Sequence, residues 1–368
     1  MFLATMILLT AGIFTVQAMR FVWFALSPAV SPTKTSMTGE KAEPKFIIVN
    51  RRESASQLTK TLESNGLVSD GRKFMWLGRL TREFNSVKAG EYAISSDMSP
   101  FQILNVLTSG ISVNHPVTVR EGENMYEIAD DIQAKGLAKK ERFIALCKDR
   151  KFMATLGIKD PLPPSLEGFL FPDTYFFNRT MQAEDLARQM YRRFTVSWGP
   201  SEEKRAQELG MNRNQVITLA SIIEKETGAP EERPLISSVF HNRIRKKMRL
   251  QSDPTTIYGM WDRYEGKIHV SDLQEQNEYN TYTIPGLPVG PISNPGKNSI
   301  QAALYPSQST FLFFVSHNNG THEFTNSLED HQRAVRKFQL DPKAREGKSW
   351  RDLKKRSFSS SPDETKKH

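Results

Sequence analysis

The feature that most constrains this chain is an internal repeat with an offset of 70 residues. Each copy predicts a short strand, a helix with Leu or Ile on one face, and a glycine that ends the helix. The copies comprise 46–49, 54–63 and Gly66, and then 117–119, 124–134 and Gly136. Similarity at a fixed spacing indicates that two related strand–helix units precede residue 150. The alternative is a coincidence of common local patterns.

The second copy resembles the signature of LysM, a small module that binds polymers of N-acetylglucosamine. The resemblance rests on residues 119–124, Val-Arg-Glu-Gly-Glu-Asn, followed by Ile128 and Ala129. The sequence departs from the LysM pattern at Asn124, where Ser or Thr is usual, and in the second half of the signature. The other interpretation is a generic strand–turn–helix unit in which Asn124 caps the helix.

The N-terminus predicts a membrane anchor. The first 19 residues contain no charged side chain, and the apolar run resumes after Arg20. About 20 apolar residues are needed to span a bilayer, so we expect residues 1–27 to be an uncleaved anchor. A cleaved signal peptide is the alternative, although such peptides usually begin with Lys or Arg. Residues 28–44 are rich in Ser, Thr, Pro and Lys and predict a linker.

The 368 residues carry a net charge of +9, which favours an anionic partner such as nucleic acid, anionic lipid or an acidic polymer. Part of the excess lies in 343–368, which predicts a basic disordered tail. No RNA-binding aromatic motif or zinc-finger spacing occurs, so we do not expect a nucleic-acid partner. The single cysteine, Cys147, excludes an intramolecular disulfide. His317 and His322 lack an HExxH motif, and we expect neither a metal nor a cofactor.

Residues 214–227 predict the helix that carries the chemistry, ended by Gly228 and Pro230. At about 100° per residue, Glu224 and Glu226 fall near opposite margins of the apolar face. Lys225 between them should point to solvent, and Glu226 lies slightly nearer the buried side. A partly buried carboxylic acid has a raised pKa, which keeps a proton available for a leaving oxygen at neutral pH. A solvated glutamate in an ordinary helix is the alternative for both, and periodicity alone does not choose between them.

The segments on either side of this helix differ in character, and residues 166–175 suit the wall of a cleft. Residues 166–175 predict a loop and strand, and 180–209 predict an amphipathic helix. After a basic helix at 233–248, residues 249–259 predict a proline-stiffened loop whose amide, hydroxyl and carboxylate groups suit a sugar. Residues 286–296 contain too much Pro and Gly for a helix or a central strand. They therefore predict a defined loop, which either lines a site or serves as a structural crossover.

Four blocks in order resemble the YceG-like family of endolytic murein transglycosylases. They are LEGFLFPDTY from residue 166, LASIIEKET from 219, SVFHNRIRKKMRLQSDPTTIYG from 238 and NTYTIPGLPVGPISNPG from 280. The resemblance covers most of 117–340, and the apolar N-terminus and the LysM-like unit fit the same family architecture. It implies internal cleavage of peptidoglycan between N-acetylmuramic acid and N-acetylglucosamine. The product implied is a 1,6-anhydromuramic end, without hydrolysis.

The resemblance identifies the catalytic glutamate as Glu226, the second Glu of the EKET block. Protonated, it would donate to the glycosidic oxygen and give an oxocarbenium-like state at muramyl C1. As a carboxylate it would then take the proton of the sugar's own O6 hydroxyl while that oxygen attacks C1. Asp253 is a candidate second electrostatic partner or a cap for the turn before Pro254. The candidate substrate-binding residues are Glu167, Gln251, Ser252, Asp253, Tyr258, Asn280 and Tyr282.

We therefore expect an α+β fold with an N-terminal membrane helix, a small βα region with a LysM-like unit, and a mixed α+β catalytic domain. The expected segments are an anchor (1–27), a linker (28–44), a βα module (45–115), a LysM-like module (116–160), a catalytic domain (161–342) and a tail (343–368). The family role implies a single-pass inner-membrane protein with a periplasmic catalytic domain. It also implies limitation of nascent strand length and contact with peptidoglycan synthases. The alternatives are a hydrolytic muramidase and a non-catalytic peptidoglycan-binding scaffold.

Overall fold

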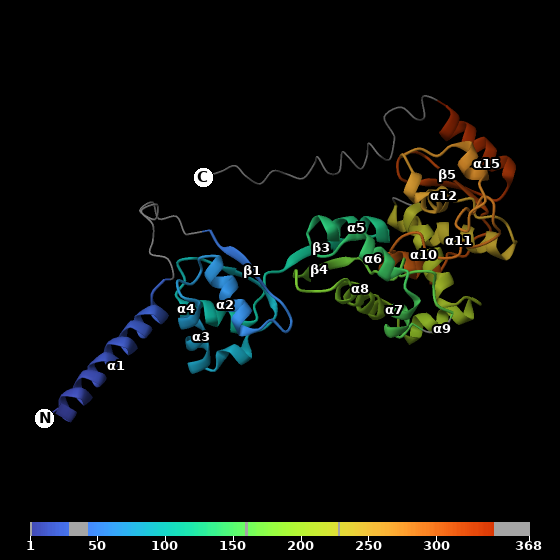
Figure 1. Cartoon of the computed structure of the whole chain (residues 1–368). Coiled ribbons are helices and arrows are strands. Elements are labelled where there is room, and N and C mark those ends of the chain that lie inside the picture. Colours follow the sequence, from blue (N-terminus) through green and yellow to red (C-terminus); the bar gives the residue numbers. More distant parts are fainter. Residues whose placement is uncertain (1, 29–42, 159–160, 227–228, 342–368) are drawn as a thin grey trace, which may run out of the picture. The chain divides into compact units, whose positions relative to one another are not determined.

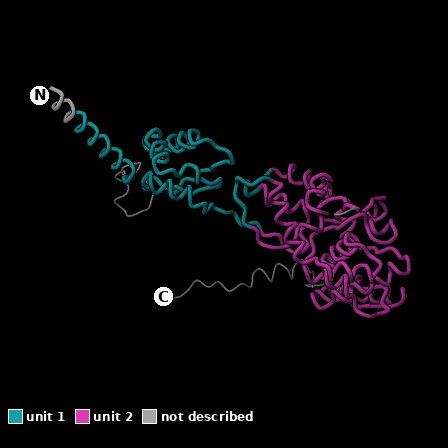
Figure 2. Tube along the Cα trace, turned by 90° about the horizontal axis from the view of Figure 1, so that it is seen from below, with its two compact units in different colours: residues 1–117, 134–138, 176–182 teal, residues 118–133, 139–175, 183–368 magenta. Residues whose placement is uncertain are grey.

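The computed structural model describes residues 2–28, 43–158, 161–226 and 229–341, and Figure 1 shows the order of their elements. The predicted tail lies outside these residues, as do most of the predicted linker and Thr227 and Gly228. The chain divides into two compact units (Figure 2). The first comprises 1–117, 134–138 and 176–182, and the second comprises 118–133, 139–175 and 183–368. The domain boundaries expected from the sequence stay predictions.

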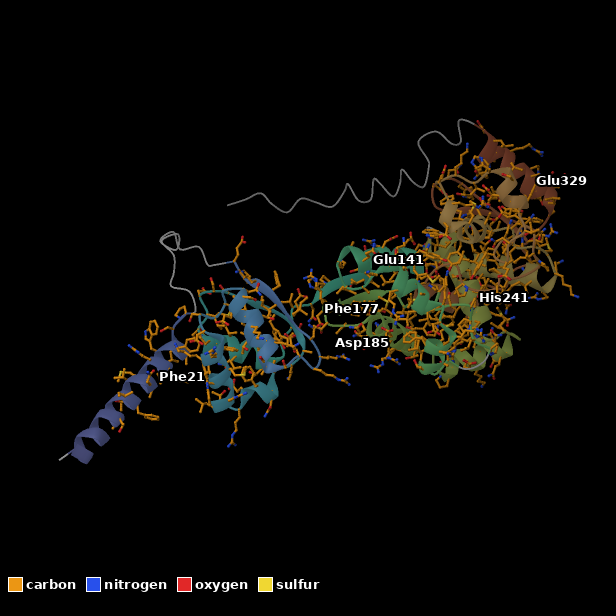
Figure 3. All side chains as sticks on the ribbon, in the orientation of Figure 1. Phe21, Glu141, Phe177, Asp185, His241 and Glu329 are labelled. Atoms are coloured by element: carbon orange, nitrogen blue, oxygen red, sulfur yellow. The ribbon has the colours of Figure 1, made fainter. Side chains whose placement is uncertain are left out.

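The first unit packs three helices against a two-stranded sheet. Its elements after α1 (Phe2–Leu26) are β1 (Lys45–Val49), α2 (Ala55–Ser64), α3 (Gly71–Leu80), β2 (Gly90–Ile94) and α4 (Pro100–Ser109). Strand β1 pairs with β2 in antiparallel register, with Val49 opposite Gly90. Phe24 and Ala25 at the end of α1 are buried in the core of this unit, with Phe21 packed against it (Figure 3). Among the residues that the structure describes, no helix is long and apolar enough to cross a membrane.

The internal repeat is confirmed. The second copy comprises β3 (His115–Val119), α5 (Met125–Ala134), α6 (Lys140–Cys147) and β4 (Asp173–Phe177), and the bounds of β1 and β3, and of α2 and α5, differ by 70 residues. Each copy pairs its first strand with its last strand. Asn124 caps α5, as one interpretation predicted, because its Oδ1 accepts from the N–H groups of Tyr126 and Glu127. Strand β4, expected in a cleft wall, is therefore the partner of β3.

Two predictions of local structure were wrong, both at a proline. The single helix expected over 180–209 is two helices, α8 (Ala183–Ser197) and α9 (Pro200–Glu208). The loop expected over 249–259 becomes a helix, α12 (Asp253–Gly259), after residue 252. Pro200 and Pro254 each lie in the first turn of the new helix. The missing N–H costs nothing there, so proline starts these helices instead of excluding them.

The second unit is built around α10 (Arg213–Glu226), the helix predicted over 214–227. Its residues from Val216 to Ile223 are all buried, so the helix is enclosed on every side and is not amphipathic over that stretch. It packs against α9, α11 (Arg233–Arg245), α12 and α14 (Lys297–Leu304). His241 lies on α11 (Figure 3). Its ring Nε2 is 2.8 Å from the carbonyl oxygen of Ala303 on α14.

The remaining elements complete a mixed α+β fold, as expected. They are α7 (Arg150–Thr155), α13 (Val270–Gln274), β5 (Phe313–Ser316), β6 (His322–Thr325) and α15 (Leu328–Val335), with short helical turns at 83–86, 230–232, 261–263 and 336–340. Strands β5 and β6 form an antiparallel pair, with Phe314 opposite Phe324. Cys147 is a buried free thiol on α6.

Candidate active site

Glu226 is the last residue of α10, and its side chain is half-buried. The hydroxyl of Ser252 donates a hydrogen bond to its Oε1. Burial raises the pKa of Glu226 to about 7, and the nearby Asp253 carboxylate raises it as well. The Ser252 hydrogen bond and the positive charge of Arg243 act in the opposite direction. A carboxyl with this pKa exists in both protonation states near neutral pH, so it is able to give and take a proton.

Ser252 is held in place by the segment that contains Thr281. Its backbone N–H donates to the Thr281 hydroxyl oxygen at 3.0 Å, and its carbonyl accepts from the Thr255 hydroxyl at 2.6 Å. The side chains of Thr255 and Thr281 also lie within hydrogen-bond distance of each other, 2.8 Å. Ser252 is 2% exposed, so these contacts fix its rotamer and aim its hydroxyl at Glu226.

Glu224, the other candidate on α10, is committed to structural contacts. Its side chain is 6% exposed; Oε1 accepts from the Arg233 guanidinium at 3.1 Å and Oε2 from the backbone N–H of Gly296 at 2.9 Å. Lys225 is exposed, as predicted, and its ammonium donates to the carbonyl of Gly122 at 3.2 Å. Among the described residues, Glu226 by contrast has one hydrogen-bond partner, Ser252. Its Oε2 has no hydrogen-bond partner among the described residues.

Three further candidates lie around Glu226. The hydroxyl of Tyr282 donates to Oδ1 of the exposed Asp253 at 2.6 Å, and burial raises the pKa of Tyr282. Asp253 acts on Glu226 through its charge, so Ser252, Asp253 and Tyr282 form one electrostatic group with the acid. Gln251 is exposed at a φ of 50°, and its N–H donates to the carbonyl of Thr281 at 3.2 Å.

Glu167, proposed from the sequence as a substrate contact, lies in the interior with no exposed surface. Its two oxygens accept from the backbone N–H of Met125, from the Tyr258 hydroxyl at 2.9 Å and from the side-chain amide of Asn294 at 2.9 Å. Burial raises the pKa of Glu167 to about 8, against the effect of these hydrogen bonds. In this arrangement the carboxyl joins α5, α12 and the 286–296 loop. Its direct contact with a glycan stays a prediction.

Asn280 and Tyr258 also use their side chains for hydrogen bonds within the protein. Asn280 is 1% exposed; its Oδ1 accepts from the Thr256 hydroxyl, and its Nδ2 donates to the carbonyls of Leu273 and Glu275. Tyr258 is 7% exposed and directs its hydroxyl to Glu167. The structure thus brings Ser252, Asp253 and Tyr282 together with Glu226 and buries Glu167, Tyr258 and Asn280 among protein groups.

The loop over 286–296 is irregular, as predicted, and its second half is buried. The Ile292 N–H donates to the Ser221 hydroxyl at 3.0 Å, and the Ser293 hydroxyl donates to the Ser221 carbonyl at 3.2 Å. The backbone N–H of Asn294 donates to the carbonyl of Glu123 at 2.8 Å. These contacts connect the loop to the middle of α10 and to the turn before α5. They account for a structural crossover, one of the two roles that the sequence left open.

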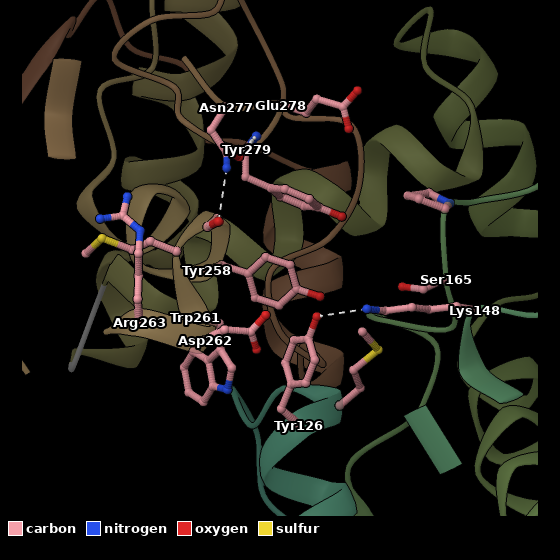
Figure 4. A pocket seen from close by; sticks show the side chains of 14 residues that line it. Tyr126, Lys148, Ser165, Tyr258, Trp261, Asp262, Arg263, Asn277, Glu278 and Tyr279 are labelled. Atoms are coloured by element: carbon pink, nitrogen blue, oxygen red, sulfur yellow. Dashed lines mark hydrogen bonds between the residues drawn. The ribbon is translucent and has the colours of Figure 1, made fainter. Parts of the chain in front are cut away.

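Sequence reasoning missed an aromatic pocket in the same unit. Its volume is about 640 Å³, and its wall includes Tyr126, Tyr258, Trp261 and Tyr279 (Figure 4). Of these four, Tyr258 alone was a candidate. The pocket combines α5 with segments more than 100 residues further along the chain, and a search for local motifs does not bring such residues together. Glu226 does not line this pocket.

Comparison with known proteins gives the same family that the four sequence blocks resemble. Residues 47–337 match the YceG-like family. A Bacillus subtilis protein named endolytic murein transglycosylase is 30% identical over 326 residues, which cover 85% of this chain and 88% of that protein. A Streptococcus pneumoniae protein of the same name is 29% identical over 79% of this chain and 58% of its own length.

A solved structure gives the same result for the fold. It is the crystal structure of a YceG-like protein from Listeria monocytogenes, 30% identical in sequence, which superposes with a TM-score of 0.55. The match covers 80% of this chain and 100% of that one. With a family match that spans most of the chain and relatives aligned over most of its length, this protein belongs to the YceG-like family.

Proposed function

We propose that this protein is an endolytic peptidoglycan lytic transglycosylase and that Glu226 is its catalytic residue. The observation that carries the proposal is the half-buried carboxyl at the end of α10, whose pKa is raised to about 7 and whose Oε2 faces no described partner. The relatives named endolytic murein transglycosylases support the same reaction class.

The mechanism uses one carboxyl twice. Protonated Glu226 donates to the glycosidic oxygen while the bond from that oxygen to muramyl C1 breaks, and positive charge develops at C1. The Glu226 carboxylate then accepts the proton of the muramyl O6 hydroxyl as O6 forms its bond to C1. The products are a free hydroxyl on the leaving sugar, a 1,6-anhydro ring and a reprotonated Glu226. The Ser252 hydrogen bond stabilises the carboxylate between the two steps.

The surroundings of Glu226 support this route over hydrolysis. A hydrolase of the common two-carboxylate type needs a second carboxylate to activate water or to attack C1. Of the nearby carboxylates, Glu224 has both oxygens held, by Arg233 and Gly296, and Asp253 accepts at Oδ1 from the Tyr282 hydroxyl. The internal O6 hydroxyl is a nucleophile that needs no second carboxylate.

The test is the chemistry of the product. Purified whole protein and its Glu226→Gln variant are incubated with sacculi, and the released fragments are identified by mass spectrometry. We expect anhydromuramic ends from the wild type and none from the variant. Reducing muramic ends would indicate a hydrolytic muramidase, and no cleavage by the wild type would favour the non-catalytic scaffold.

A matched control separates the role of Glu226 from a general effect of removing a negative charge. Glu231→Gln makes the same change at an exposed position a few residues further along the chain, and we expect wild-type cleavage from it. Wild-type activity in Glu226→Gln would instead move the catalytic role to another carboxyl. Glu224→Gln is the next variant to make in that event.

We also propose where the enzyme works and how it is held there. Peptidoglycan lies outside the inner membrane, so the substrate requires a periplasmic catalytic domain, and the uncharged run before Arg20 supports an anchor within 1–27. The β3–α5–α6–β4 unit supports a LysM-like module that binds the glycan strand. Limitation of nascent strand length and contact with peptidoglycan synthases belong to the same proposal.

The location has its own test. Cells expressing the protein are fractionated, and the membranes are washed with alkaline carbonate. Retention of the whole chain in the washed membranes, and its release when 1–27 is deleted, is the result expected of an anchor. Release of the whole chain by the wash would rule the anchor out. Protection from protease in intact cells but not in spheroplasts would support the periplasmic side.

A further inference from the structure

We propose that the aromatic pocket beside α12 is a second saccharide-binding site, which holds an uncharged face of the glycan strand away from the bond that is cut. The inference rests on the proposed function, since it extends the substrate beyond the residues around Glu226. The pocket belongs to the second unit and is formed by α5, by the segments at 148 and 164–165, and by the chain on both sides of α13 (Figure 4).

The four aromatic side chains form a continuous surface. The rings of Tyr126 and Trp261 lie nearly parallel, 15° apart, with centroids separated by 6.0 Å. Tyr258 lies 6.0 Å from Tyr126, and Tyr279 lies 4.8 Å from Tyr258. Tyr126, Trp261 and Tyr279 are partly exposed, whereas Tyr258 is buried between them. Three ring systems are therefore accessible on the wall of one cavity.

Such a surface suits a pyranose ring. The faces of an equatorially substituted sugar present C–H groups, and aromatic faces carry partial negative charge that attracts them. The hydroxyls and acetamide then point outwards, where they need polar partners at the rim. Asp262 and Glu278 supply exposed carboxylates there, which accept hydrogen bonds from hydroxyl and amide groups.

The charges of the pocket disfavour an anionic ligand. Of its two cationic side chains, Arg263 pairs with Asp272 and Glu275, and Lys148 keeps its charge while donating to the Tyr126 hydroxyl at 3.2 Å. A phosphate or a peptide carboxylate would meet this one cation and would also face the two acids at the rim. The sugar rings of the strand fit these groups better than the acidic peptide stems that they carry.

The pocket lies next to the catalytic group through one rigid helix. Ser252, which contacts Glu226, immediately precedes α12, and Tyr258 near the end of α12 lines the pocket. Six residues of helix correspond to roughly 9 Å along the axis. A polymer bound at Glu226 that extends over this distance along α12 would reach the pocket. Occupation of both places would favour cleavage within a strand, because an end lacks the additional sugars.

The test measures binding separately from cleavage. Glu226→Gln protein is titrated calorimetrically with peptide-free glycan oligomers, alone and combined with Trp261→Ala, Trp261→Phe or Trp76→Ala. Trp76 is the matched control, because it is an exposed tryptophan in the other unit. We expect Trp261→Ala to weaken binding at least tenfold, Trp261→Phe to restore most of the affinity, and Trp76→Ala to leave it unchanged.

Kinetics of the same substitutions in the active enzyme provide the second measurement. Trp261→Ala should raise KM for long strands by a similar factor while kcat stays near the wild-type value, since Glu226 and Ser252 are untouched. Equal affinity and equal KM in Trp261→Ala would overturn the pocket while the enzyme activity stands. Affinity only for oligomers that carry peptide stems would overturn the preference for sugar.

The two proposals also fail in different ways. A wild-type protein that cleaves nothing, but whose glycan affinity depends on Trp261, would refute the reaction and leave the binding site. An active wild type whose glycan affinity is insensitive to Trp261, or equally reduced by Trp76→Ala, would refute the binding site and leave the reaction.

Discussion

Two buried carboxyl groups in the second unit, Glu226 and Glu167, look alike in their electrostatics and differ in their access. Burial raises the pKa of the first to about 7 and of the second to about 8. Glu226 is half-buried and has one described hydrogen-bond partner, whereas Glu167 has no exposed surface and three partners. A raised pKa therefore reflects burial, and partial exposure with fewer described partners distinguishes the candidate acid from the structural group.

The contacts of Glu167 explain why the protein retains a carboxyl group that is unfavourable to bury. The donors come from Met125 at the start of α5, Tyr258 on α12 and Asn294 in the 286–296 loop. One side chain thus joins three segments that are distant in sequence. A fully satisfied buried network of this kind sets the relative positions of its members. Glu167 joins these segments, whereas Glu226 lies at the end of α10 with one described partner.

The largest expected effect is on the rate of cleavage, which should differ strongly between variants of Glu226 and Glu167. Glu226→Gln removes the proton donor and should lower the rate of glycan cleavage on the order of a thousandfold. Glu167→Gln leaves Glu226 intact and should retain more than about a tenth of the rate. The measurement is the release of anhydromuramic fragments at a saturating amount of sacculi. A loss in Glu167→Gln as large as that in Glu226→Gln would break the distinction between the two groups.

Stability should show the reverse order. In Glu167→Gln, the new NH₂ group faces donors where an oxygen accepted before, which should destabilise the fold by about 1–3 kcal/mol. Below about pH 4.5, where the Glu226 carboxyl is protonated, Glu226→Gln should change the free energy of unfolding by less than about 0.5 kcal/mol, since Oε2 has no described partner. Urea denaturation followed by circular dichroism measures both. Equal stabilities would mean that the Glu167 network contributes little.

The pH dependence of stability separates the same two groups. A carboxyl whose pKa is raised in the folded state stabilises the fold most at low pH, and this contribution is lost as pH rises through the folded value. For Glu167 the loss should extend from about 4.5 to about 8, and for Glu226 from about 4.5 to about 7. Unfolding at a series of pH values should therefore show a shallower decline in Glu167→Gln above pH 7, with no such change in Glu226→Gln.

A smaller effect is expected in the pH profile of cleavage. The rate should fall above about pH 7, where Glu226 loses the proton it must donate. Ser252→Ala removes a contact that lowers the pKa of Glu226, so the alkaline limb should move to higher pH. Asp253→Asn removes a charge that raises it, so the limb should move to lower pH. Shifts of the same sign in both variants would contradict the assignment of the limb to Glu226.

The smallest effect is expected at Tyr282. Tyr282→Phe removes the 2.6 Å hydrogen bond to Asp253 but keeps the ring. Since Asp253 is exposed, the stability should change by less than about 1 kcal/mol, and the rate should fall no more than a few-fold. Initial rates and urea midpoints of the variant provide the check. A loss comparable to that of Glu226→Gln would make Tyr282 a catalytic residue in its own right.

Periodicity and local capping rules predicted the parts of this fold that depend on neighbours in sequence. The repeat, the cap at Asn124 and the bounds of α10 to within one residue all follow from such patterns. Residues 249–259 were predicted to be a proline-stiffened loop. Pro254 instead occupies the first turn of a helix, where an absent N–H is tolerated, and Ser252 before it contacts Thr281, a residue distant in sequence.

The sequence predicted which residues belong to the candidate site, but not which of them are buried. The sequence predicted Ser252, Asp253 and Tyr282 for the same site as Glu226, and the structure brings the four together. It did not separate them from the buried candidates Glu167 and Asn280, because hydrogen-bonding side chains of the same types serve both a substrate and a buried network. The aromatic pocket was missed for a related reason: its members meet only after folding.

The position of Glu226 as the final residue of α10 adds one more influence on its proton. Peptide dipoles aligned along a helix leave partial negative charge at its carboxyl end, which disfavours an anion there by about 0.3–1 kcal/mol in exposed settings. This partial negative charge, which has the same sign as the carboxylate, favours the return of a proton to Glu226 after it has donated one. The backbone of α10 thereby supplies part of the drive for the second half of the reaction, with no additional side chain.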